Sequence, residues 1–443
     1  DVQLLDVNPY SRPGTTIDEI HGIVIHYTAN PGSTAQENRD YFNGLKDSHE
    51  TEASSNFVVG LEGEIIQCVP TWEMAYASNE RNADTVSIEC CHPDETGKFT
   101  KETYQSMVQL TAWLCKKYNL NEDEIKPYFS LESVRNGLYY VANKLYGITL
   151  TELNNVSVYE PDVKVYEVKD ADGAYLGLFY ADYFPRTGKR GGAWMSNFRE
   201  QAGDVRPLIY NVASFTKPAG DMPSLLTLDE VETMFHEFGH ALHGMLTKCN
   251  YLGVSGTNVA QDFVELPSQI MEHWAVEPEV LKVYAKHYKT GEVIPDELIR
   301  KIQDQNTFNQ GFMTTELLAA ALLDMELHNL TDTASLDVVA FEKAVMDKLG
   351  LIPEIAPRYR ATYFNHILSG YAAGYYSYLW AEVLDADAFE AFKEHGLFDK
   401  NTADSFRRNV LEKGGTEDPM VLYKAFRGAE PSLEPLLKNR GLK

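Results

Sequence analysis

The sequence predicts an α+β protein made of two parts: a small mixed α/β unit over residues 1–119, followed by a mainly α-helical domain with a small β-sheet over residues 120–443. Three observations lead to this prediction. Strand-like and helix-like segments alternate in the first part, alternating apolar and polar residues mark strands between residues 156 and 212, and helical spacing dominates after residue 227. At 443 residues the chain is long enough for two or more domains, each with a buried core.

The composition is that of a globular protein, with 44% hydrophobic and 23% charged residues. A formal net charge of −26 argues against a nucleic-acid partner. We expect no transmembrane helix, because no run of about eighteen apolar residues occurs, and no signal peptide is visible. The chain opens at Asp1, which leaves a processed or incomplete N-terminus open. The five cysteines fit neither a disulfide framework nor a zinc ribbon, so we expect reduced thiols.

The first part contains four strand-like and two helix-like segments. We predict a strand over 22–28, a helix capped by Ser33 and running through Phe42, strands over 56–59 and 64–67, a strand over 85–90 and a helix over 100–118. The two middle strands flank residues 60–63, where Gly60 and Gly63 favour a hairpin turn.

The second part begins with a helical pattern over residues 130–146 and continues into strands. We predict strands over 157–160, 163–168, 174–182 and 208–212, with a turn at residues 170–173. Helices should follow from residue 227 onward, including segments over 314–330 and 341–349.

A short motif with metal-binding spacing lies in the first of these helices. His236, Glu237 and His240 form H-E-x-x-H, and residues four apart lie on one face of an α-helix. Thr227 and Glu230 have the spacing of a capping box, which supports the helix. The two imidazoles could bind one Zn²⁺, with Glu237 as general base on a water molecule. A chance occurrence on an ordinary helix is the alternative.

The third ligand is left open by spacing alone. A metzincin pattern fails, because Leu246 stands where that pattern needs its third histidine. His243 could compete for the metal, although packing is the interpretation we favour. Two histidines and one glutamate make a catalytic zinc set with an open fourth position. Asp262, Glu265 and Glu272 all compete for this place.

Several separated sequence blocks extend the motif. They are His236–His240, Ser255–Asn258, Asp262–Glu265, Pro267–Gln269, Gly188–Trp194 and Phe215–Gly220. Together they resemble the thimet oligopeptidase and dipeptidyl carboxypeptidase family of zinc peptidases, from about residue 121 to the C-terminus. The resemblance implies a zincin-like catalytic domain in which His236, His240 and Glu265 hold one Zn²⁺ ion. It also implies substrate contacts at Gly256 and Thr257, and the segment 210–215 is our candidate for an edge strand that pairs with substrate backbone.

A tyrosine-rich segment follows His366. Tyr371, Tyr375 and Tyr378 are spaced i, i+4 and i+7, which predicts one helical face. An aromatic core stripe is the alternative. The family resemblance implies that His366 and these tyrosines donate hydrogen bonds to the scissile carbonyl and the substrate backbone, and we favour Tyr378 for the oxyanion.

The segment 356–366 looks closer to the dipeptidyl carboxypeptidase branch than to thimet oligopeptidase. This resemblance implies the release of C-terminal dipeptides from short peptides. Such an enzyme must recognise a free carboxylate, which arginine does well through paired charged hydrogen bonds. Arg358 and Arg360 are our candidates, with ordinary surface arginines as the alternative.

The first part resembles a second family. The segments 25–29, 53–59 and 87–89 are similar to zinc-dependent N-acetylmuramoyl-L-alanine amidases of the peptidoglycan-recognition type. The resemblance implies that His26 is a zinc ligand and that Glu89 assists catalysis. No histidine lies between His92 and His236, so the remaining ligands of that family are missing. We therefore expect a truncated amidase-like unit with a degenerate site.

The two resemblances set the remaining expectations. The second part lacks the N-terminal helical region of its family, which suggests a fusion of two incomplete genes. We expect a monomeric zinc metallopeptidase acting on short peptides, without nucleic-acid or membrane partners, and the cytoplasm is the favoured compartment. The alternative is a peptidoglycan-binding or amidase-derived module, with peptidoglycan fragments as partners, joined to an inactive peptidase fragment.

Overall fold

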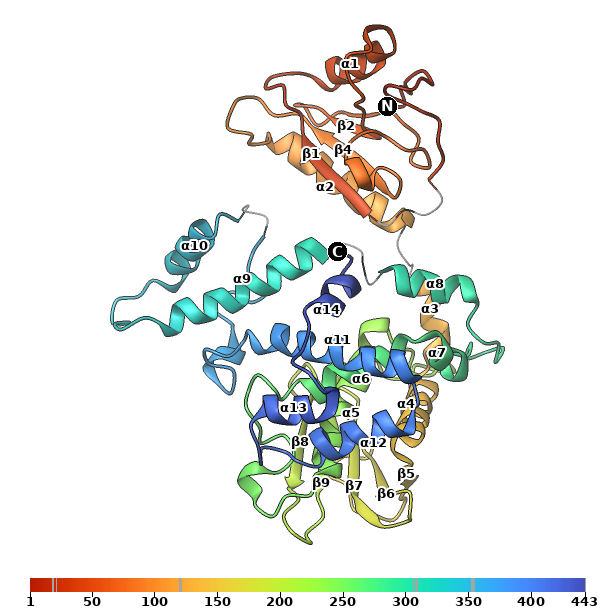
Figure 1. The fold of residues 1–443 in the computed structure, drawn as a ribbon, viewed down its shortest axis with the longest axis vertical. Helices are drawn as coiled ribbons and strands as arrows, with labels where there is room; N and C mark the ends of the chain where they lie inside the picture. Colours follow the sequence, from red (N-terminus) through yellow and green to blue (C-terminus); the bar gives the residue numbers. More distant parts are fainter. Residues whose placement is uncertain are drawn as a thin grey trace. The chain divides into compact units, whose positions relative to one another are not determined.

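The computed structural model describes residues 1–17, 20, 22–118, 122–305, 307, 310–351 and 355–442, apart from the side chains of residues 80, 115–118, 122 and 123. Its contacts divide the chain into two compact units. The first comprises Asp1–Asn121 and Asp304–Asn309, and the second comprises Glu122–Gln303 and Gln310–Lys443. Figure 1 shows the order of the elements along the chain. The expected mixed α and β content and the mainly helical second part are confirmed.

In the described part of the first unit, four strands form one sheet in the order β1-β4-β2-β3. These strands are β1 (Gly22–Tyr27), β2 (Phe57–Val59), β3 (Ile65–Gln67) and β4 (Thr85–Cys90). The pairs β1–β4 and β4–β2 are parallel, and β2–β3 is the expected hairpin. Val58 packs with residues of α1 (Ala35–Ser48), while Phe57 and Val59 pack with residues of α2 (Lys101–Tyr118). The alternation of side chains along β2 therefore builds a core on each face.

The helix predicted from Ser33 through Phe42 has different ends. Thr34, rather than Ser33, is the N-cap, and it forms a capping box with Glu37. The Ser33 hydroxyl instead donates to the Asn30 carbonyl oxygen at 2.6 Å. The helix continues beyond Phe42 to Ser48, because amphipathic spacing persists to the buried Leu45.

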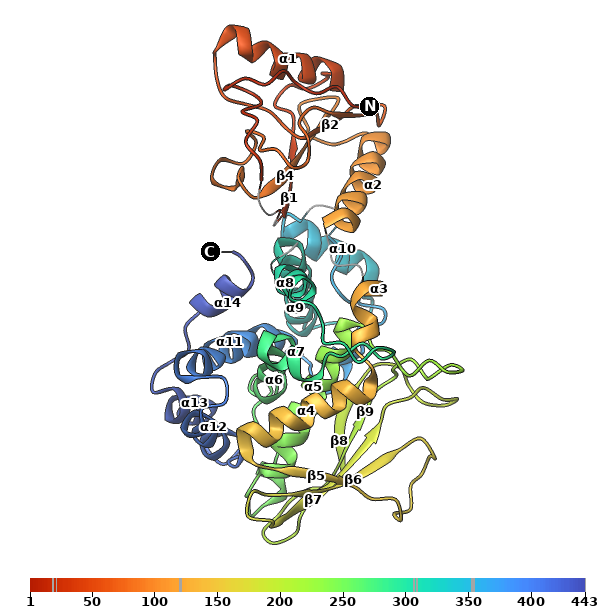
Figure 2. The same ribbon diagram turned by 90° about the vertical axis from the view of Figure 1, so that its right-hand side faces the viewer.

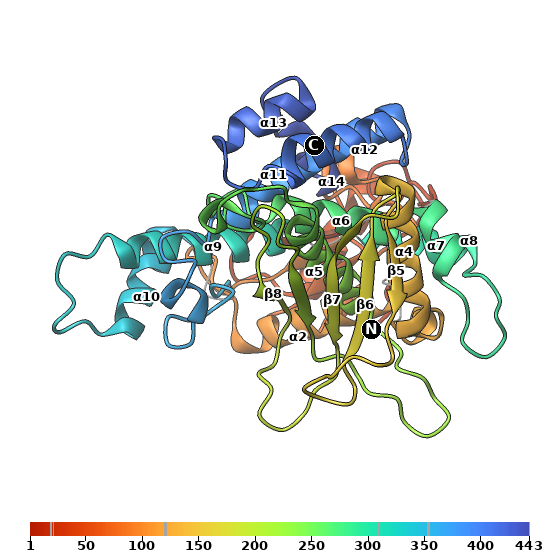
Figure 3. The same cartoon turned by 90° about the horizontal axis from the view of Figure 1, so that it is seen from below.

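In the second unit, the strands that the structure describes form a sheet in the order β5-β6-β7-β9-β8. They are β5 (Thr149–Glu152), β6 (Lys164–Lys169), β7 (Tyr175–Asp182), β8 (Trp194–Arg199) and β9 (Leu208–Val212). Figure 3 shows this sheet with β5 at one end and β8 at the other. The β7–β9 pair is parallel, and the other neighbouring pairs are antiparallel.

The structure corrects two predictions about strands. Residues 157–160, predicted as a strand, have no regular secondary structure, and bends occur at 159 and 160. The segment 210–215, predicted to supply an edge strand, belongs partly to β9, which lies inside the sheet between β7 and β8. The edge strand next to β9 is β8, which follows the glycine-rich segment 188–192. Strand order depends on pairing between distant segments, so local alternation of residues does not reveal which strand ends the sheet.

Helices make up most of the rest of the second unit. In chain order they are α3 (Glu122–Ile125), α4 (Leu131–Tyr146), α5 (Leu228–Leu246), α6 (Leu266–Val276), α7 (Pro278–Tyr284), α8 (Asp296–Gln305), α9 (Gln310–His328), α10 (Val338–Lys348), α11 (Ser377–His395), α12 (Lys400–Phe406), α13 (Pro419–Arg427) and α14 (Glu434–Asn439). Figure 2 shows α5 behind α4 and beside α6, and α5 also packs on β7, β9 and β8. None of the helices in the described ranges is long and apolar enough to span a membrane.

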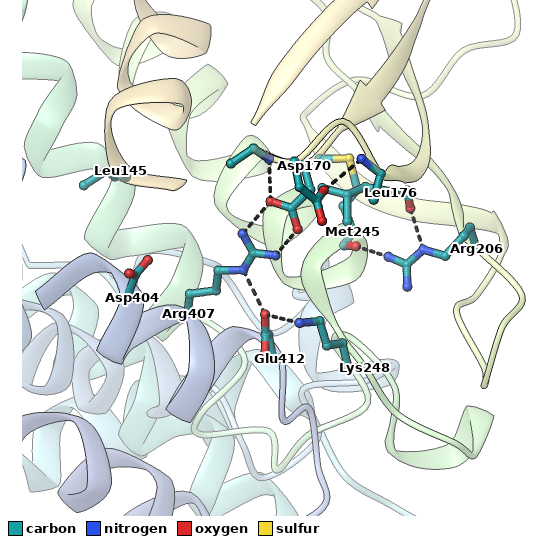
Figure 4. A network of polar contacts seen from close by, with 12 residues as sticks. Leu145, Asp170, Leu176, Arg206, Met245, Lys248, Asp404, Arg407 and Glu412 are labelled. Atoms are coloured by element: carbon teal, nitrogen blue, oxygen red, sulfur yellow. Dashed lines mark hydrogen bonds and ion pairs between the residues drawn. The ribbon is translucent and has the colours of Figure 1, made fainter. Parts of the chain in front are cut away.

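A polar network joins distant parts of the second unit (Figure 4). The guanidinium of Arg407, which follows α12, donates to both carboxylate oxygens of Asp170 in the β6–β7 turn, at 2.9 and 2.5 Å. It also donates to Glu412 at 2.9 Å, and Glu412 pairs with Lys248 beyond the end of α5. Arg407 is only 9% exposed, so these charge-assisted bonds compensate the loss of its hydration.

Candidate active site

The helix α5 carries three of the candidate site residues, His236, Glu237 and His240. Its first turn is fixed by the predicted capping box, in which the Thr227 hydroxyl accepts from the Glu230 N–H and the Glu230 carboxylate accepts from the Thr227 N–H. His236 and His240 then lie one turn apart with ring centroids separated by 5.0 Å. The i, i+4 spacing therefore brings both imidazoles to one side of the helix, as the sequence predicted.

A glycine lets a second helix approach this pair. A Cβ atom on Gly239 would lie 2.1 Å from the carbonyl oxygen of Pro267, far inside van der Waals contact. The absence of that atom allows the start of α6 to pack directly on α5. Glu265, the residue before α6, then places Oε2 at 3.3 Å from His236 Nε2 and at 3.1 Å from His240 Nε2.

Two further side chains hold the Glu265 carboxylate, which is 2% exposed. The Ser268 hydroxyl donates to Oε2 at 2.8 Å, and the Tyr371 hydroxyl donates to Oε1 at 2.6 Å. Burial raises the pKa of Glu265, but the imidazoles of His240 and His236 outweigh burial and hold the pKa well below its ordinary value. Glu265 is therefore an anion at neutral pH, as a metal ligand must be.

The three side chains fit a zinc ion. Their ligand atoms all lie within 4.8 Å of one another, and two imidazoles with one carboxylate make a known catalytic zinc set. Glu272 Oε1 lies 2.6 Å from His236 Nδ1, which leaves the Nε2 lone pair of His236 free to bind a cation. Among the described residues, no other group of three such side chains gathers in this way.

The other candidate ligands lie apart from this cluster. The Asp262 carboxylate accepts a hydrogen bond from the Tyr376 hydroxyl at 3.0 Å. His243 is fully buried, and burial lowers its pKa to about 3. Glu232, one turn before His236 on α5, makes no described hydrogen bond to that residue, whose Nδ1 is contacted by Glu272 instead. Packing therefore brings Glu265 to both imidazoles, and Glu272 to Nδ1 of His236.

Glu237 is the candidate base. Glu237 is 8% exposed, and its Oε2 has no hydrogen-bond partner. Burial raises the pKa of Glu237, against the opposing effect of the two nearby imidazoles. A carboxylate with a raised pKa and an unoccupied oxygen is suited to accept a proton.

These groups open into a cavity of about 690 Å³. The lining comes from the loop before β8 and the start of β8, from α5, from residues 257–265 ahead of α6, and from the segment 359–378. The lining residues are Arg190, Gly191, Gly192, Ala193, Trp194, Met195, His236, Glu237, His240, Thr257, Val264, Glu265, Tyr359, Asn365, His366, Ser369, Tyr371 and Tyr378.

The buried Lys189 anchors the loop before β8. Its ammonium donates to the carbonyl oxygens of Asp182, Phe184 and Ala213 at 2.9, 2.8 and 2.5 Å, and to Asp182 Oδ1 at 3.0 Å. The next residue, Arg190, lines the cavity with its guanidinium 5.0 Å from the centre of the Trp194 ring. This segment is one of the blocks that carry the family resemblance, but the sequence pattern does not predict that Arg190 lines the cavity.

The tyrosine-rich segment differs from its prediction. Residues 369–376 form turns, and α11 begins only at Ser377, so the tyrosines do not share one helical face. Tyr371 and Tyr378 nevertheless stack in the cavity wall, with ring centroids 5.2 Å apart. Tyr375 is 2% exposed and packs against Phe364 instead. His366 lines the cavity, and burial together with the charges of Arg358 and Arg190 lowers its pKa.

The remaining predicted substrate contacts fall in different places. Thr257 lines the cavity, whereas Gly256 is buried against Gly244 of α5. Arg358 is exposed near His366, but Arg360 pairs with the buried carboxylate of Glu342. Because Glu342 also accepts from the Ala361 N–H at 2.7 Å, the charge of Arg360 is used within the fold.

In the first unit, His26 and Glu89 are opposite each other on β1 and β4. His26 Nδ1 lies 4.0 Å from Glu89 Oε1, and the His26 side chain is 45% exposed. His92 lies close in sequence, but its two ring nitrogens contact the carbonyl oxygens of Asp94 and Thr28 at 2.7 and 2.6 Å. The side chains in these described positions do not assemble a three-ligand set.

Comparisons with known proteins agree with these two regions. Residues 99–442 match the model of peptidase family M3, and residues 16–133 match that of N-acetylmuramoyl-L-alanine amidase. Dipeptidyl carboxypeptidase of Escherichia coli is 43% identical over 377 residues, which are 84% of this chain and 55% of that protein. Oligopeptidase A of Escherichia coli is 41% identical over 334 residues, or 74% of this chain and 49% of that protein. The chain thus spans about half the length of the curated relatives it matches.

The solved structures that match include an endolysin and an amidase, each over about a quarter of this chain. A mutant endolysin from Bacillus subtilis is 24% identical, with a TM-score of 0.24, over 28% of this chain and 80% of that chain. The amidase LysC from Clostridium intestinale is 17% identical, with a TM-score of 0.22, over 27% of this chain and 76% of that chain. The match to the M3 model covers more than three quarters of the sequence and contains the whole cluster around Glu265, so the chain belongs to peptidase family M3.

Proposed function

We propose that this chain is a zinc-dependent peptidase that hydrolyses short peptides and releases dipeptides from free C-termini. The observation that carries the proposal is the meeting of His236, His240 and Glu265 beside Glu237 in one cavity. The relatives named dipeptidyl carboxypeptidase support the peptide class of substrate.

Zinc held by His236, His240 and Glu265 would supply a Lewis acid in this cavity. Glu237, with its raised pKa and unpartnered Oε2, would take the proton of the attacking water and pass it to the leaving amine. Glu272 would fix the ring of His236 through Nδ1.

Stabilisation of the developing oxyanion is assigned to donors from the segment 359–378, which lines the cavity. Tyr371 already donates to Glu265, so we assign it to holding that carboxylate. Tyr378 stacks on Tyr371, and burial raises the pKa of its hydroxyl far above the ordinary value, which keeps it a proton donor. His366, whose lowered pKa makes it neutral at neutral pH, would donate to the substrate backbone.

The strand β8 offers the means of aligning a peptide. It is the edge of its sheet on the side where Trp194 and Met195 line the cavity. An extended peptide can add to such an edge through main-chain hydrogen bonds. We therefore assign the pairing with substrate backbone to β8, in place of the segment 210–215 predicted from the sequence.

Recognition of the free C-terminal carboxylate is assigned to arginine. Arg360 is engaged by Glu342, which leaves Arg358 of the two predicted candidates. Arg190 joins it, because Arg190 lines the cavity and no described ion pair occupies its guanidinium. A guanidinium binds a carboxylate through two parallel charged hydrogen bonds, and a terminal amide cannot accept the same pair.

The test compares matched peptides that end in a carboxylate or an amide, incubated with the zinc-loaded full chain. We expect dipeptide release from the free acids and a loss of about tenfold or more on amidation, because one charged pair contributes roughly 1.5–3 kcal/mol. Arg190→Gln and Arg358→Gln should reduce this preference, while Arg360→Gln serves as the matched control. Equal cleavage of both peptides at internal bonds would instead assign the chain to the oligopeptidase type.

A binding measurement covers the case of slow turnover. Calorimetric titration with dipeptides should show tighter binding of the free acid than of the amide. Binding to cell-wall sacculi, without any peptide cleavage or dipeptide binding, would favour the alternative of an amidase-derived module joined to an inactive peptidase part.

A further inference from the structure

The turns over residues 369–376 are tied to a carboxylate far away in sequence. Asp324 of α9 is 0% exposed. Its Oδ1 accepts the backbone N–H of Ala373 at 3.0 Å, and its Oδ2 accepts the backbone N–H of Tyr375 at 2.9 Å. His328, one helical turn later, places Nδ1 at 2.8 Å from Asp324 Oδ1. The carboxylate thus has a partner on each oxygen, as a buried anion requires.

The backbone at one of these contacts has an unfavourable conformation. Ala373 has φ of 50°, and only two other non-glycine residues in the described ranges, His49 and Asn79, have positive φ. An alanine in the left-handed region lacks the local side-chain hydrogen bond that stabilises asparagine or aspartate there. Such a conformation persists only where surrounding contacts impose it. The bond from Ala373 to Asp324 is a contact of this kind.

The same bonds explain why the segment is not helical. In a continuous α-helix, the N–H groups of Ala373 and Tyr375 would donate to carbonyl oxygens four residues earlier. Asp324 accepts both N–H groups instead, and α11 starts two residues after Tyr375. An anion beside the N-terminus of a 19-residue helix is also favoured by the helix dipole.

The consequence reaches the cavity through the tyrosines on either side. Tyr371, two residues before Ala373, donates to Glu265, and Tyr378, three residues after Tyr375, stacks on Tyr371. Tyr375 is packed in the apolar cluster that contains Leu317 and Ala320 of α9. The position of the segment along α9 therefore determines where both cavity tyrosines lie.

We infer that Asp324 is a positioning residue of the active site, which holds segment 369–376 through the N–H groups of Ala373 and Tyr375 and so sets Tyr371 on Glu265 and Tyr378 in the cavity wall. Asp324 itself lines no part of the cavity and touches no candidate metal ligand. Its catalytic consequence rests on the proposed function, whereas its effect on the segment does not.

The experiment compares Asp324→Asn with the unchanged full chain, both loaded with zinc. The asparagine NH₂ group cannot accept a hydrogen bond, so one of the two backbone N–H groups loses its acceptor. We expect faster amide hydrogen exchange over residues 369–376, with α5 still protected and zinc content unchanged. We also expect kcat to fall about 10- to 100-fold with a smaller change in KM, because small displacements of catalytic groups have effects of this size.

The matched control is Asp387→Asn on α11. Asp387 is also a buried carboxylate, 5% exposed, and accepts the Tyr423 hydroxyl at 2.6 Å. This variant should lose stability without faster exchange over residues 369–376. If both variants accelerate exchange there equally, or if Asp324→Asn leaves it unchanged, the inference is wrong.

A second variant examines the bond from its other end. Ala373→Pro removes the N–H that donates to Asp324 and forbids positive φ. It should produce the same local loss of protection, with a large fall in kcat and a smaller change in KM. This variant keeps the inference testable if Asp324→Asn does not fold. If the unchanged chain cleaves no peptide, the proposed function fails, and hydrogen exchange still decides the role of Asp324. Full protection of residues 369–376 in Ala373→Pro would overturn that role.

Discussion

The two units each place a histidine beside a glutamate, yet they differ in what surrounds the pair. In the first unit, His26 and Glu89 face each other across two parallel strands, and the histidine is 45% exposed. In the second unit, His236 and His240 come from one helix, and Glu265 arrives from the start of another helix that packs against it. A helix supplies two ligands on one face through local spacing, whereas neighbouring residues of a strand point to opposite faces. A strand-based site therefore depends more heavily on distant segments.

The largest effect is expected when the candidate general base of the second unit, Glu237, is changed. Glu237→Gln keeps the shape of the side chain but removes its ability to accept a proton. We expect zinc binding to persist and the rate of peptide hydrolysis to fall about 10²- to 10⁴-fold. Metal analysis by mass spectrometry, together with a peptide-cleavage assay, gives both readouts. Full activity in this variant would contradict the assigned mechanism.

The approach of α6 to α5 can be disrupted without changing any ligand. Gly239→Ala puts a Cβ atom where the Pro267 carbonyl oxygen now lies, so α6 must move away. We expect a loss of about 1–3 kcal/mol in the free energy of unfolding, the usual cost of overpacking, and weaker zinc binding. Thermal unfolding and zinc titration measure these effects. Gly311→Ala is the control, because a Cβ atom there meets open space and alanine favours a helix.

How much of this arrangement follows from sequence depends on the range of the interaction. The helix around His236 was predictable, because its capping box and its apolar spacing are local. The choice of Glu265 over Asp262 was not decided by local pattern, since it depends on where α6 packs. The family resemblance indicated Glu265, and the structure places Glu265 within reach of both imidazoles.

The missed features have the same cause. The edge position of β8 depends on pairing with β9, which follows it in sequence but separates it from β7. The turns at Ala373 depend on Asp324, 49 residues earlier, so the tyrosine spacing wrongly indicated a continuous helix. Likewise, Arg360 pairs with Glu342, 18 residues earlier, and is therefore not free to bind a substrate carboxylate. Each distant partner overrides a local preference.

A milder variant tests the support behind the metal ligands. Glu272→Gln weakens the bond to His236 Nδ1 without altering a ligand. We expect zinc affinity to fall about 10- to 100-fold, the usual effect of removing such a partner. Glu232→Gln is the control, because Glu232 makes no hydrogen bond to His236. Competition with a chelator gives both affinities, and equal loss in the two variants would mean that the contact between Glu272 and His236 is not responsible.

The smallest effect is expected in the first unit. His26→Ala should leave the zinc content of the full chain at one ion and should not change peptide cleavage, because His26 has no described set of partner ligands. No amidase activity toward peptidoglycan is expected before or after the change. Release of L-alanyl peptides that requires His26 and zinc would show that the difference between the two units is smaller than their geometry suggests.

The contact between Arg407 and Asp170 also bears on how such a chain can arise by recombination of genes. It joins residues 237 positions apart in sequence, and the same guanidinium reaches Glu412. A breakpoint between these positions would leave the guanidinium of Arg407, which is 9% exposed, without its carboxylate partner, and this destabilises the fold. A breakpoint before Glu122 separates none of these residues. The stretch from Asp170 to Glu412 is therefore expected to be inherited as one block, while the sequence joined ahead of it can be exchanged.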